Sequence, residues 1–219
     1  MVHPKNKNPI PIDKRIISVN NLSVNYENNE VIKNLSFQIS KGEKVVITGE
    51  SGRGKSTILN TLLGFVPISE GEIYFFDKKL TAENISKIRS RVAWLPQETA
   101  LHFDAVNDII YSLFNLKINK AKYPSKYEID QILQNLNIPP SILDKEIDEI
   151  SGGQKQRILL AGALLLKKDI LVMDEPTSDL DEKNKKSITD FILSQKDLTV
   201  ITASHDTYWI ERSSKIIAL

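Results

Sequence analysis

The chain has 219 residues, of which 41% are hydrophobic and 26% are charged, as is ordinary for a soluble globular protein of one domain. Its 29 basic and 28 acidic residues leave a net charge of +1, which lacks the basic excess of a nucleic-acid-binding domain, so we expect no nucleic-acid partner. Cysteine is absent, which excludes disulfides, thiol catalysis and thiolate metal sites. The sequence has no run of about 18 apolar residues, the length that a membrane helix needs, so we predict no membrane helix.

The first part of the chain predicts an extension followed by antiparallel strands. Residues 1–14 are rich in proline, asparagine and lysine and have no hydrophobic period, so we expect a flexible N-terminal extension. Residues 16–19 and 22–24 mix β-branched with polar side chains, which predicts strand structure. Residues 31–39 alternate between apolar and polar positions, as a half-buried antiparallel strand does, and Asn28-Asn29 is a turn signal before them.

The next segments alternate strands with a helix. Residues 44–48 form a short apolar, β-branched run that ends in a glycine-rich stretch, which is typical of a buried parallel strand entering a loop. Residues 56–63 then predict a helix, and Gly64 is a plausible stop. Further short strands are predicted at 71–76 and 91–95.

From about residue 100 to residue 150, helical patterns punctuated by prolines replace the strands. With a helix from Ser151 to about Leu166, they predict an inserted α-helical subdomain over about residues 100–165. The α/β alternation then resumes, with predicted elements at 170–173 (strand), 182–194 (helix), 198–202 (strand) and 215–218 (strand). We therefore expect one α/β domain over residues 15–219 with a mainly parallel sheet.

The strongest motif is the segment Gly49-Glu50-Ser51-Gly52-Arg53-Gly54-Lys55-Ser56-Thr57, which matches G-x-x-x-x-G-K-[ST] between a predicted strand and a predicted helix. Glycines let backbone N–H groups turn toward phosphate oxygens at a helix N-terminus. The lysine supplies a positive charge for the β- and γ-phosphates, and Ser56 offers a hydroxyl to Mg²⁺. A chance glycine-rich turn is the alternative, which the strand–loop–helix context disfavours. The candidate phosphate-binding residues are Gly49, Ser51, Gly52, Gly54, Lys55, Ser56 and Thr57.

A second candidate motif is the apolar strand over residues 170–173 that ends in Asp174 and Glu175. The first carboxylate is suited to hold Mg²⁺, and the second to orient and polarise an attacking water in phosphoryl transfer. A strand that ends in two solvated acids is the alternative, and the phosphate-binding loop in the same chain argues against it. Together the motifs predict Mg²⁺-dependent hydrolysis of a nucleoside triphosphate.

The segment Ile150-Ser151-Gly152-Gly153-Gln154-Lys155-Gln156-Arg157 resembles the signature sequence of ABC ATPases, which usually reads Leu-Ser-Gly-Gly-Gln. Isoleucine stands at position 150 in place of leucine, with a similar apolar volume. Ser151 followed by Gln154 is also a capping box that opens a helix, so a structural role and phosphate binding are compatible. A cap alone does not call for two adjacent glycines, because glycine weakens a first helical turn.

The resemblance covers nearly the whole chain from residue 15 and implies a P-loop NTPase core with an N-terminal antiparallel β subdomain. It also implies roles for four further residues. These are stacking on adenine for Tyr26, contact with Mg²⁺ and water for Gln97, a place in the loop that crosses between subunits for Asp181, and contact near the γ-phosphate for His205. Alternatives are a partly exposed strand tyrosine at Tyr26 and a simple helix cap at Asp181.

In such ATPases two copies pair head to tail, so that the Lys55 loop of one copy and the Ser151–Gln154 segment of the other enclose one ATP. The resemblance thus implies an ATP- and Mg²⁺-dependent subunit whose dimer closure powers transport. A separate membrane-spanning permease would hold it at the cytoplasmic face of the cell membrane. The stretches 94–103, 181–185 and 217–219 are similar to compact bacterial ABC ATPases associated with metal (iron) export.

Two other function classes compete with transport. The first is a soluble, non-transport ABC ATPase that acts as an assembly scaffold, which membrane association with a partner subunit would exclude. DNA-repair types carry coiled-coil or cysteine-rich insertions and translation types carry two ATPase units, and neither pattern is seen. The second is a catalytically inactive binding module, which fits poorly because the candidate catalytic residues are all present: Lys55, Gln97, Asp174, Glu175 and His205.

Overall fold

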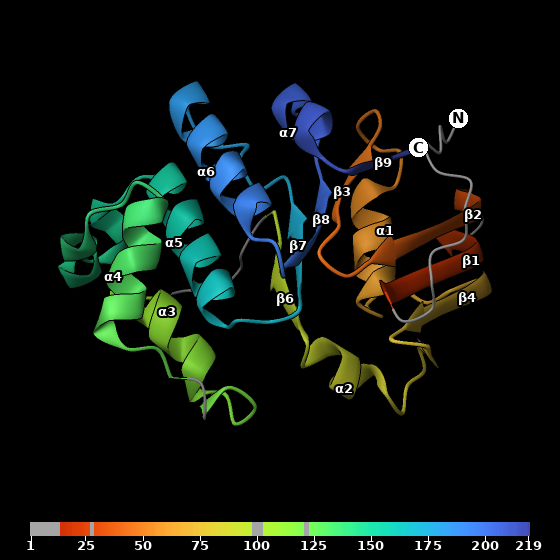
Figure 1. Ribbon diagram of the computed structural model, residues 1–219, viewed down its shortest axis with the longest axis horizontal. Coiled ribbons are helices and arrows are strands. Elements are labelled where there is room, and N and C mark those ends of the chain that lie inside the picture. The colour runs from red at the N-terminus through yellow and green to blue at the C-terminus, as the bar shows by residue number, and fades with distance from the viewer. Residues whose placement is uncertain (1–13, 27–28, 98–102, 121–122) are drawn as a thin grey trace.

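The computed structural model describes residues 14–26, 29–97, 103–120 and 123–219. The predicted N-terminal extension, except for Lys14, lies outside the described residues, and so does Asn28 of the predicted turn. The described residues form an antiparallel sheet, a parallel sheet and a group of helices, arranged side by side along the longest axis of the molecule (Figure 1).

The antiparallel sheet has the strand order β2-β1-β4-β5. Its strands are β1 (Arg15–Tyr26), β2 (Asn29–Ser40), β4 (Glu70–Phe75) and β5 (Lys78–Lys79). Both predicted strand-like runs belong to β1, which stays continuous because a register shift between Val19 and Leu22 absorbs the asparagines between them, with Asn21 in a left-handed conformation at φ 49°. The predicted antiparallel pairing of residues 31–39 is confirmed by the pairing of β2 with β1.

The parallel sheet has the strand order β6-β7-β8-β3-β9. Its strands are β3 (Lys44–Thr48), β6 (Val92–Leu95), β7 (Ile170–Asp174), β8 (Thr199–Ala203) and β9 (Lys215–Ala218). All of its strand pairs are parallel, as the short apolar runs predicted. The carboxyl ends of β3, β7 and β8 therefore meet at the same edge of the sheet.

Two hydrophobic cores lie on opposite faces of this sheet, because successive side chains of a strand point to opposite sides. In β7, Ile170 and Val172 pack in the core shared with α1 (Lys55–Leu62) and the antiparallel sheet. Leu171 and Met173 pack in the core shared with α6 (Glu182–Ser194) and the helical group. Figure 1 shows α1 on one side of the parallel sheet and α5, α6 and α7 on the other.

The helical group contains α3 (Val106–Asn115), α4 (Lys126–Asn135) and α5 (Gly152–Leu165), with two 3-10 turns, η3 (Pro140–Asp144) and η4 (Ile147–Glu149). Helix α5 packs against α3, α4 and strand β6, which explains its long apolar run. A Cβ at Gly162 would lie 2.7 Å from Leu113 Cδ1, so the glycine permits the close crossing of α5 with α3. The predicted helices are present, and the boundaries of a separate subdomain stay a prediction.

The sequence patterns missed two short helices, α2 (Ile85–Arg89) and α7 (Thr207–Arg212). Both are too short to show a helical period. Helix α7 depends on Asp206, whose Oδ1 accepts a hydrogen bond from the Tyr208 N–H at 2.8 Å, and on the fully buried side chain of Trp209. Within the described residues, no helix has both the length and the apolar character needed to cross a membrane.

Candidate functional site

A cavity of about 670 Å³ lies at the carboxyl edge of the parallel sheet. Most of the residues that the sequence singled out line it. They come from the loop after β3, the segment after β6, and the ends of β7 and β8: Gly49, Ser51, Gly52, Gly54, Lys55, Ser56, Thr57, Gln97, Asp174, Glu175 and His205. Segments far apart in sequence thus meet because parallel strands present the same ends to one edge.

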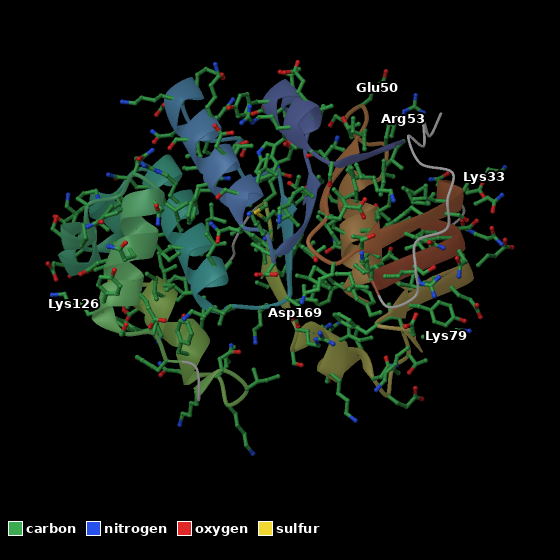
Figure 2. All side chains as sticks on the ribbon, viewed as in Figure 1. Lys33, Glu50, Arg53, Lys79, Lys126 and Asp169 are labelled. Carbon is green, nitrogen blue, oxygen red and sulfur yellow. The ribbon has the colours of Figure 1, made fainter. Side chains whose placement is uncertain are left out.

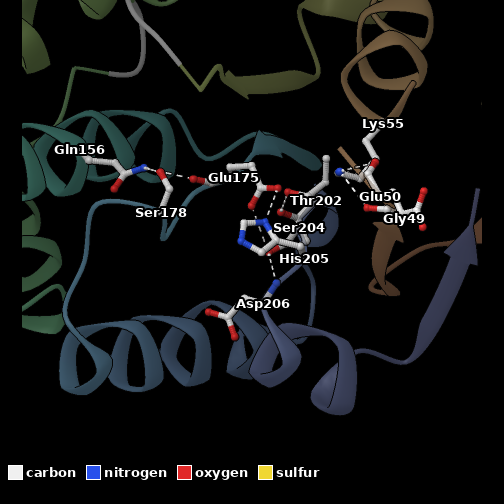
Figure 3. Close-up of polar contacts among 11 residues, drawn as sticks. Gly49, Glu50, Lys55, Gln156, Glu175, Ser178, Thr202, Ser204, His205 and Asp206 are labelled. Carbon is white, nitrogen blue, oxygen red and sulfur yellow. Dashed lines mark hydrogen bonds and ion pairs between the residues drawn. The ribbon is translucent and has the colours of Figure 1, made fainter. Parts of the chain in front are cut away.

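The glycine-rich loop joins β3 to α1, as predicted, and wraps around the ammonium group of Lys55. Its Nζ donates hydrogen bonds to Gly49 O at 3.0 Å and Glu50 O at 3.2 Å (Figure 3). Gly54 has φ 92°, and a Cβ there would lie 2.8 Å from Val31 Cγ1 on β2. Only glycine therefore fits where the loop touches the antiparallel sheet. The result is a positive charge at a helix N-terminus, which favours an anion.

Two of the loop positions that accept any residue carry charged side chains, Glu50 and Arg53, whose ends are mostly exposed. They lie at the outer edge of the molecule (Figure 2) and form an ion pair at 3.3 Å. An exposed pair of this kind contributes little to stability. The loop therefore presents its backbone and Lys55 to the cavity, while the charged ends of Glu50 and Arg53 lie mostly in solvent.

Asp174, at the end of β7, is buried and lines the cavity together with Ser56 at the start of α1. Burial raises the pKa of the Asp174 carboxyl above its usual value, and the charge of Glu175 acts in the same direction, while Ser56 and Lys55 oppose the shift. A small divalent cation would offset the cost of this buried carboxylate, and a carboxylate beside a hydroxyl is the oxygen ligand set that Mg²⁺ prefers. The residues therefore fit Mg²⁺.

Glu175 is held by contacts that no local pattern predicts. Its backbone has φ 45°, unusual for a residue with a side chain, and its N–H donates to Ala203 O at 2.9 Å. Its carboxylate contacts His205 Nδ1 at 2.9 Å and accepts a hydrogen bond from the Ser204 hydroxyl at 3.4 Å (Figure 3). The carboxylate is thus fixed toward the cavity, as a group that orients a water molecule must be.

Two residues that contact Glu175, Ser204 and Gln156, were not predicted as site residues from the sequence. Ser204 precedes the predicted His205 and is fully buried, and its contact with Glu175 exists only because β7 and β8 are neighbours in the sheet. Gln156 lies within α5, and its amide reaches the backbone of Glu175 from across the fold. Both residues lie close to predicted site residues in the sequence, Ser204 beside His205 and Gln156 two positions after Gln154, but their spacing from Glu175 gives no sign of the contact.

The signature segment opens α5 with the predicted capping box. Ser151 Oγ accepts from the Gln154 N–H at 3.2 Å, and Gln154 Oε1 accepts from the Ser151 N–H at 2.9 Å. The two glycines differ. A Cβ at Gly153 would lie 2.8 Å from Asp179 O, whereas a Cβ at Gly152 would meet no described atom within 4 Å beyond its chain neighbours and the backbone of its own helix. The second glycine serves internal packing, and the first leaves open space.

The signature segment, Tyr26 and Asp181 do not line the cavity formed by the described residues. Asp181 caps α6, since its Oδ1 accepts from the Asn184 N–H at 3.0 Å, so the predicted capping contact is confirmed. Tyr26 ends β1 with 49% of its surface exposed, which leaves its ring available for stacking. One chain therefore brings together the phosphate-binding and carboxylate residues and keeps the α5 N-terminus apart.

Comparison with known proteins gives consistent matches along the chain. The family model described as ABC transporter matches residues 32–178. A probable metal transport system ATP-binding protein of Chlamydia pneumoniae is 34% identical over 202 residues, 89% of this chain and 76% of the relative. The ergothioneine transport ATP-binding protein EgtV of Helicobacter pylori (strain G27) is 32% identical over 198 residues, 88% of this chain and 91% of the relative.

Among solved structures, the dimeric post-hydrolysis state of the ATP-binding cassette MJ0796, bound to ADP and Pi, is similar with a TM-score of 0.80 and 26% sequence identity. The match covers 93% of this chain and 94% of that one. The arrangement of sheets and helices described above is therefore that of an ATP-binding cassette.

Proposed function

The chain belongs to the ABC transporter family as an ATP-binding subunit, and on this premise we propose that it hydrolyses Mg²⁺-ATP as a head-to-tail dimer that powers a membrane-spanning permease. One observation carries the proposal. The cavity gathers the residues that phosphoryl transfer needs, while the N-terminus of α5 lies apart from it with an open glycine. A site divided in this way within one chain is completed by a second copy.

In the proposed binding mode, the phosphates of ATP lie in the glycine-rich loop, where its backbone N–H groups, Lys55 and Thr57 hold them. Ser56, Asp174 and Gln97 would hold Mg²⁺, which would supply positive charge to neutralise the phosphate oxygens. The exposed ring of Tyr26 stacks on adenine. The places of Ser56 and Asp174 support this assignment, because both line the same cavity and the Ser56 hydroxyl opposes the rise that burial causes in the pKa of the Asp174 carboxyl.

For the hydrolytic step, we assign the carboxylate of Glu175 to orient the attacking water and accept its proton. The water oxygen forms a bond with the γ-phosphorus as the bond between that phosphorus and the β–γ bridging oxygen breaks, which yields ADP and phosphate. His205 contacts the carboxylate at 2.9 Å, and its ring is largely exposed, so it can also reach the γ-phosphate. The protein supplies position and charge and forms no covalent intermediate.

In the proposed dimer, the N-terminus of α5 faces the ATP held by the partner copy. The capping box of Ser151 and Gln154 fixes this helix start, Gly152 and Gly153 turn their backbone N–H groups and the positive end of the helix dipole toward the phosphates, and the open space at Gly152 admits a phosphate. ATP then favours the closed dimer by its greater affinity for it, and loss of the γ-phosphate lets the pair open. The loop that contains Asp181 lies between the two sites.

We propose that this cycle drives transport at the cytoplasmic face of the cell membrane, through a permease that supplies the membrane-spanning part. The two relatives are named for different cargoes, a metal and ergothioneine. A cassette of this type therefore serves several cargoes, and the permease selects among them. The similarity of short stretches to iron-export ATPases remains a hypothesis about cargo.

The variant Glu175→Gln tests the proposal. It retains a side chain of the same shape but removes the carboxylate, so hydrolysis should fall at least about a hundredfold while ATP binding persists. ATP should then hold the dimer closed, which size-exclusion chromatography with light scattering detects in Mg²⁺-ATP. A folded Glu175→Gln chain that stays monomeric at saturating Mg²⁺-ATP would contradict the proposed composite site. Omission of Mg²⁺ should lower the dimer fraction, a readout independent of hydrolysis.

A further inference from the structure

Gln156 is a buried polar residue that lies two positions after the Ser151–Gln154 stretch, and the proposed function gives it no role. It lies one helical turn after Gly152, on the same face of α5. Its Nε2 donates hydrogen bonds to Glu175 O at 3.2 Å and Ser178 Oγ at 3.5 Å (Figure 3). The side chain of Gln156, on the first turns of α5, thus reaches the backbone of Glu175, whose carboxylate lines the cavity.

The oxygen of the same amide, Gln156 Oε1, is buried and does not contribute a hydrogen bond among the described residues. An unpaired buried oxygen lowers stability, so an apolar side chain of similar shape would suit the fold equally well or better. Stability therefore does not explain a glutamine at this position, and the donor Nε2 is the part of the side chain that matters.

The residue that receives this hydrogen bond is already in a restricted backbone conformation. Glu175 has φ 45°, and its carbonyl also accepts from the Ser178 N–H at 3.2 Å. A non-glycine residue holds this conformation only when its neighbours impose it. Because the carbonyl and the side chain are both attached to the Cα of Glu175, a displacement of this backbone unit moves the carboxylate together with the carbonyl.

The first turn of α5 is in close contact with the loop that follows Glu175. At Gly153, any side chain would collide with the backbone of Asp179, at 2.8 Å from its carbonyl oxygen. With the hydrogen bonds of Gln156, two separate contacts join α5 to the loop over residues 175–181. A shift of the helix must therefore move this loop or strain both contacts.

We propose that Gln156 is a positioning residue that couples the place of α5 to the carboxylate of Glu175 in the same chain. This inference rests on the proposed function, in which the N-terminus of α5 binds the ATP of the partner copy. Binding at one site then sets the geometry for hydrolysis at the other. A chain hydrolyses its own ATP efficiently only when its α5 is seated on the partner's nucleotide.

The decisive variant is Gln156→Met, which keeps the length and volume of the side chain and removes the donor. We expect kcat to fall about tenfold with KM for ATP within about twofold of wild type, since nucleotide contacts are untouched. The midpoint of thermal unfolding should stay equal or rise, because the unpaired Oε1 is also gone. Gln156→Asn, whose amide is too short to reach, covers the case that the first variant does not fold, and it should show the same loss of kcat.

Dimer formation separates this role from the composite site itself. The specific activity should depend on protein concentration as in wild type, with the same half-maximal concentration and a plateau about tenfold lower. In a Glu175→Gln background, Gln156→Met should still form the ATP-dependent dimer. The matched control is Gln134→Ala on the exposed face of α4, which should retain wild-type kcat.

Several outcomes would overturn the inference. These are a folded Gln156→Met chain with wild-type kcat, a loss of thermal stability without a loss of kcat, and a loss of the dimer together with kcat. A wild-type chain without ATP hydrolysis, or a Glu175→Gln chain without an ATP-dependent dimer, would contradict the proposed function first.

Discussion

In the proposed function, the cavity at the sheet edge and the N-terminus of α5 bind nucleotide in two different ways. The cavity is lined by residues at the ends of β3, β6, β7 and β8. It brings together the ammonium group of Lys55, the buried carboxylate of Asp174 and the hydrogen-bonded carboxylate of Glu175 within one chain. The α5 terminus offers only a capped helix start and an open position at Gly152. The contrast indicates that the catalytic groups are assembled by folding and the second binding surface by pairing.

The two regions are also stabilised differently. In the parallel sheet, which we call the core region, β7 is fully buried and ends in Asp174, and burial raises the pKa of the Asp174 carboxyl. In the helical group, apolar packing holds the helices, and exposed capping boxes at Ser125 and Ser151 fix where α4 and α5 begin. Substitutions in the parallel sheet should therefore change ATP binding. Substitutions in the helical group should change the packing of α5 or the formation of the dimer.

The largest expected effect is that of Lys55→Ala in the core region. Loss of the ammonium group, which the loop carbonyls of Gly49 and Glu50 hold in place, should weaken ATP binding by about a hundredfold or more. Titration with a fluorescent ATP analogue measures this. Lys33→Ala, which removes an exposed lysine of β2, is the matched control. Unchanged affinity in Lys55→Ala would exclude the loop as the phosphate site.

A second, smaller effect compares two adjacent glycines of the helical region. Gly153→Ala should lower the free energy of unfolding by about 1 to 3 kcal/mol, because its Cβ would meet Asp179 O at 2.8 Å. Gly152→Ala should leave stability within about 0.5 kcal/mol and weaken the ATP-dependent dimer about tenfold, because the methyl group occupies the space for the partner's phosphate. Urea unfolding and analytical ultracentrifugation of both variants distinguish the roles, and equal effects would show that the glycines are equivalent.

The smallest effect concerns pH. The Lys167 ammonium and the capping contacts with Ser125 lower the pKa of the Glu128 carboxyl from 4.5 to about 2. Its contribution to stability is therefore complete above pH 4.5 and is lost as pH falls toward 2. The difference in thermal midpoint between wild type and Glu128→Gln should be full at pH 6 and narrow below pH 4.5. Glu211→Gln, at an exposed position on α7, is the control, and a difference that stays constant with pH would contradict the assignment.

For Asp174 in the core the linkage has the opposite sign. Burial raises the pKa of its carboxyl in the folded state, so protonation at acid pH favours the folded chain at this position. Acid pH therefore removes the stabilising contribution of Glu128 in the helical group. In the parallel sheet it protonates Asp174 and so removes the cost of burying its charged carboxylate. The pH series would thus sharpen the distinction between the two regions.

Much of the fold could be predicted because its signals are local. The alternation in residues 31–39, the capping box of Ser151 with Gln154, and the helix over residues 182–194 each depend on neighbours in sequence, and the structure has all three. Helices α2 and α7 could not be found in this way, since five or six residues do not show a period.

The same division holds for the site. Two local patterns predict a nucleotide site: a glycine-rich loop before a lysine, and two acids after an apolar strand. The loop N–H groups and the lysine suit phosphate, and carboxylate oxygens suit Mg²⁺. The hydrogen bonds from Ser204 and Gln156 to Glu175 could not be read from any spacing. They join segments 19 and 29 residues apart, and only the packing of β8 and α5 around β7 brings them together.

The sequence by itself determined the chemistry of this protein, since the identity of Lys55, Ser56, Asp174 and Glu175 defines what can be bound and polarised. Tertiary structure alone decided the direction of the Glu175 carboxylate and the different surroundings of Gly152 and Gly153. The reason is physical. Chemical identity belongs to single residues, whereas orientation and free space arise from contacts between segments that meet only when the chain is folded.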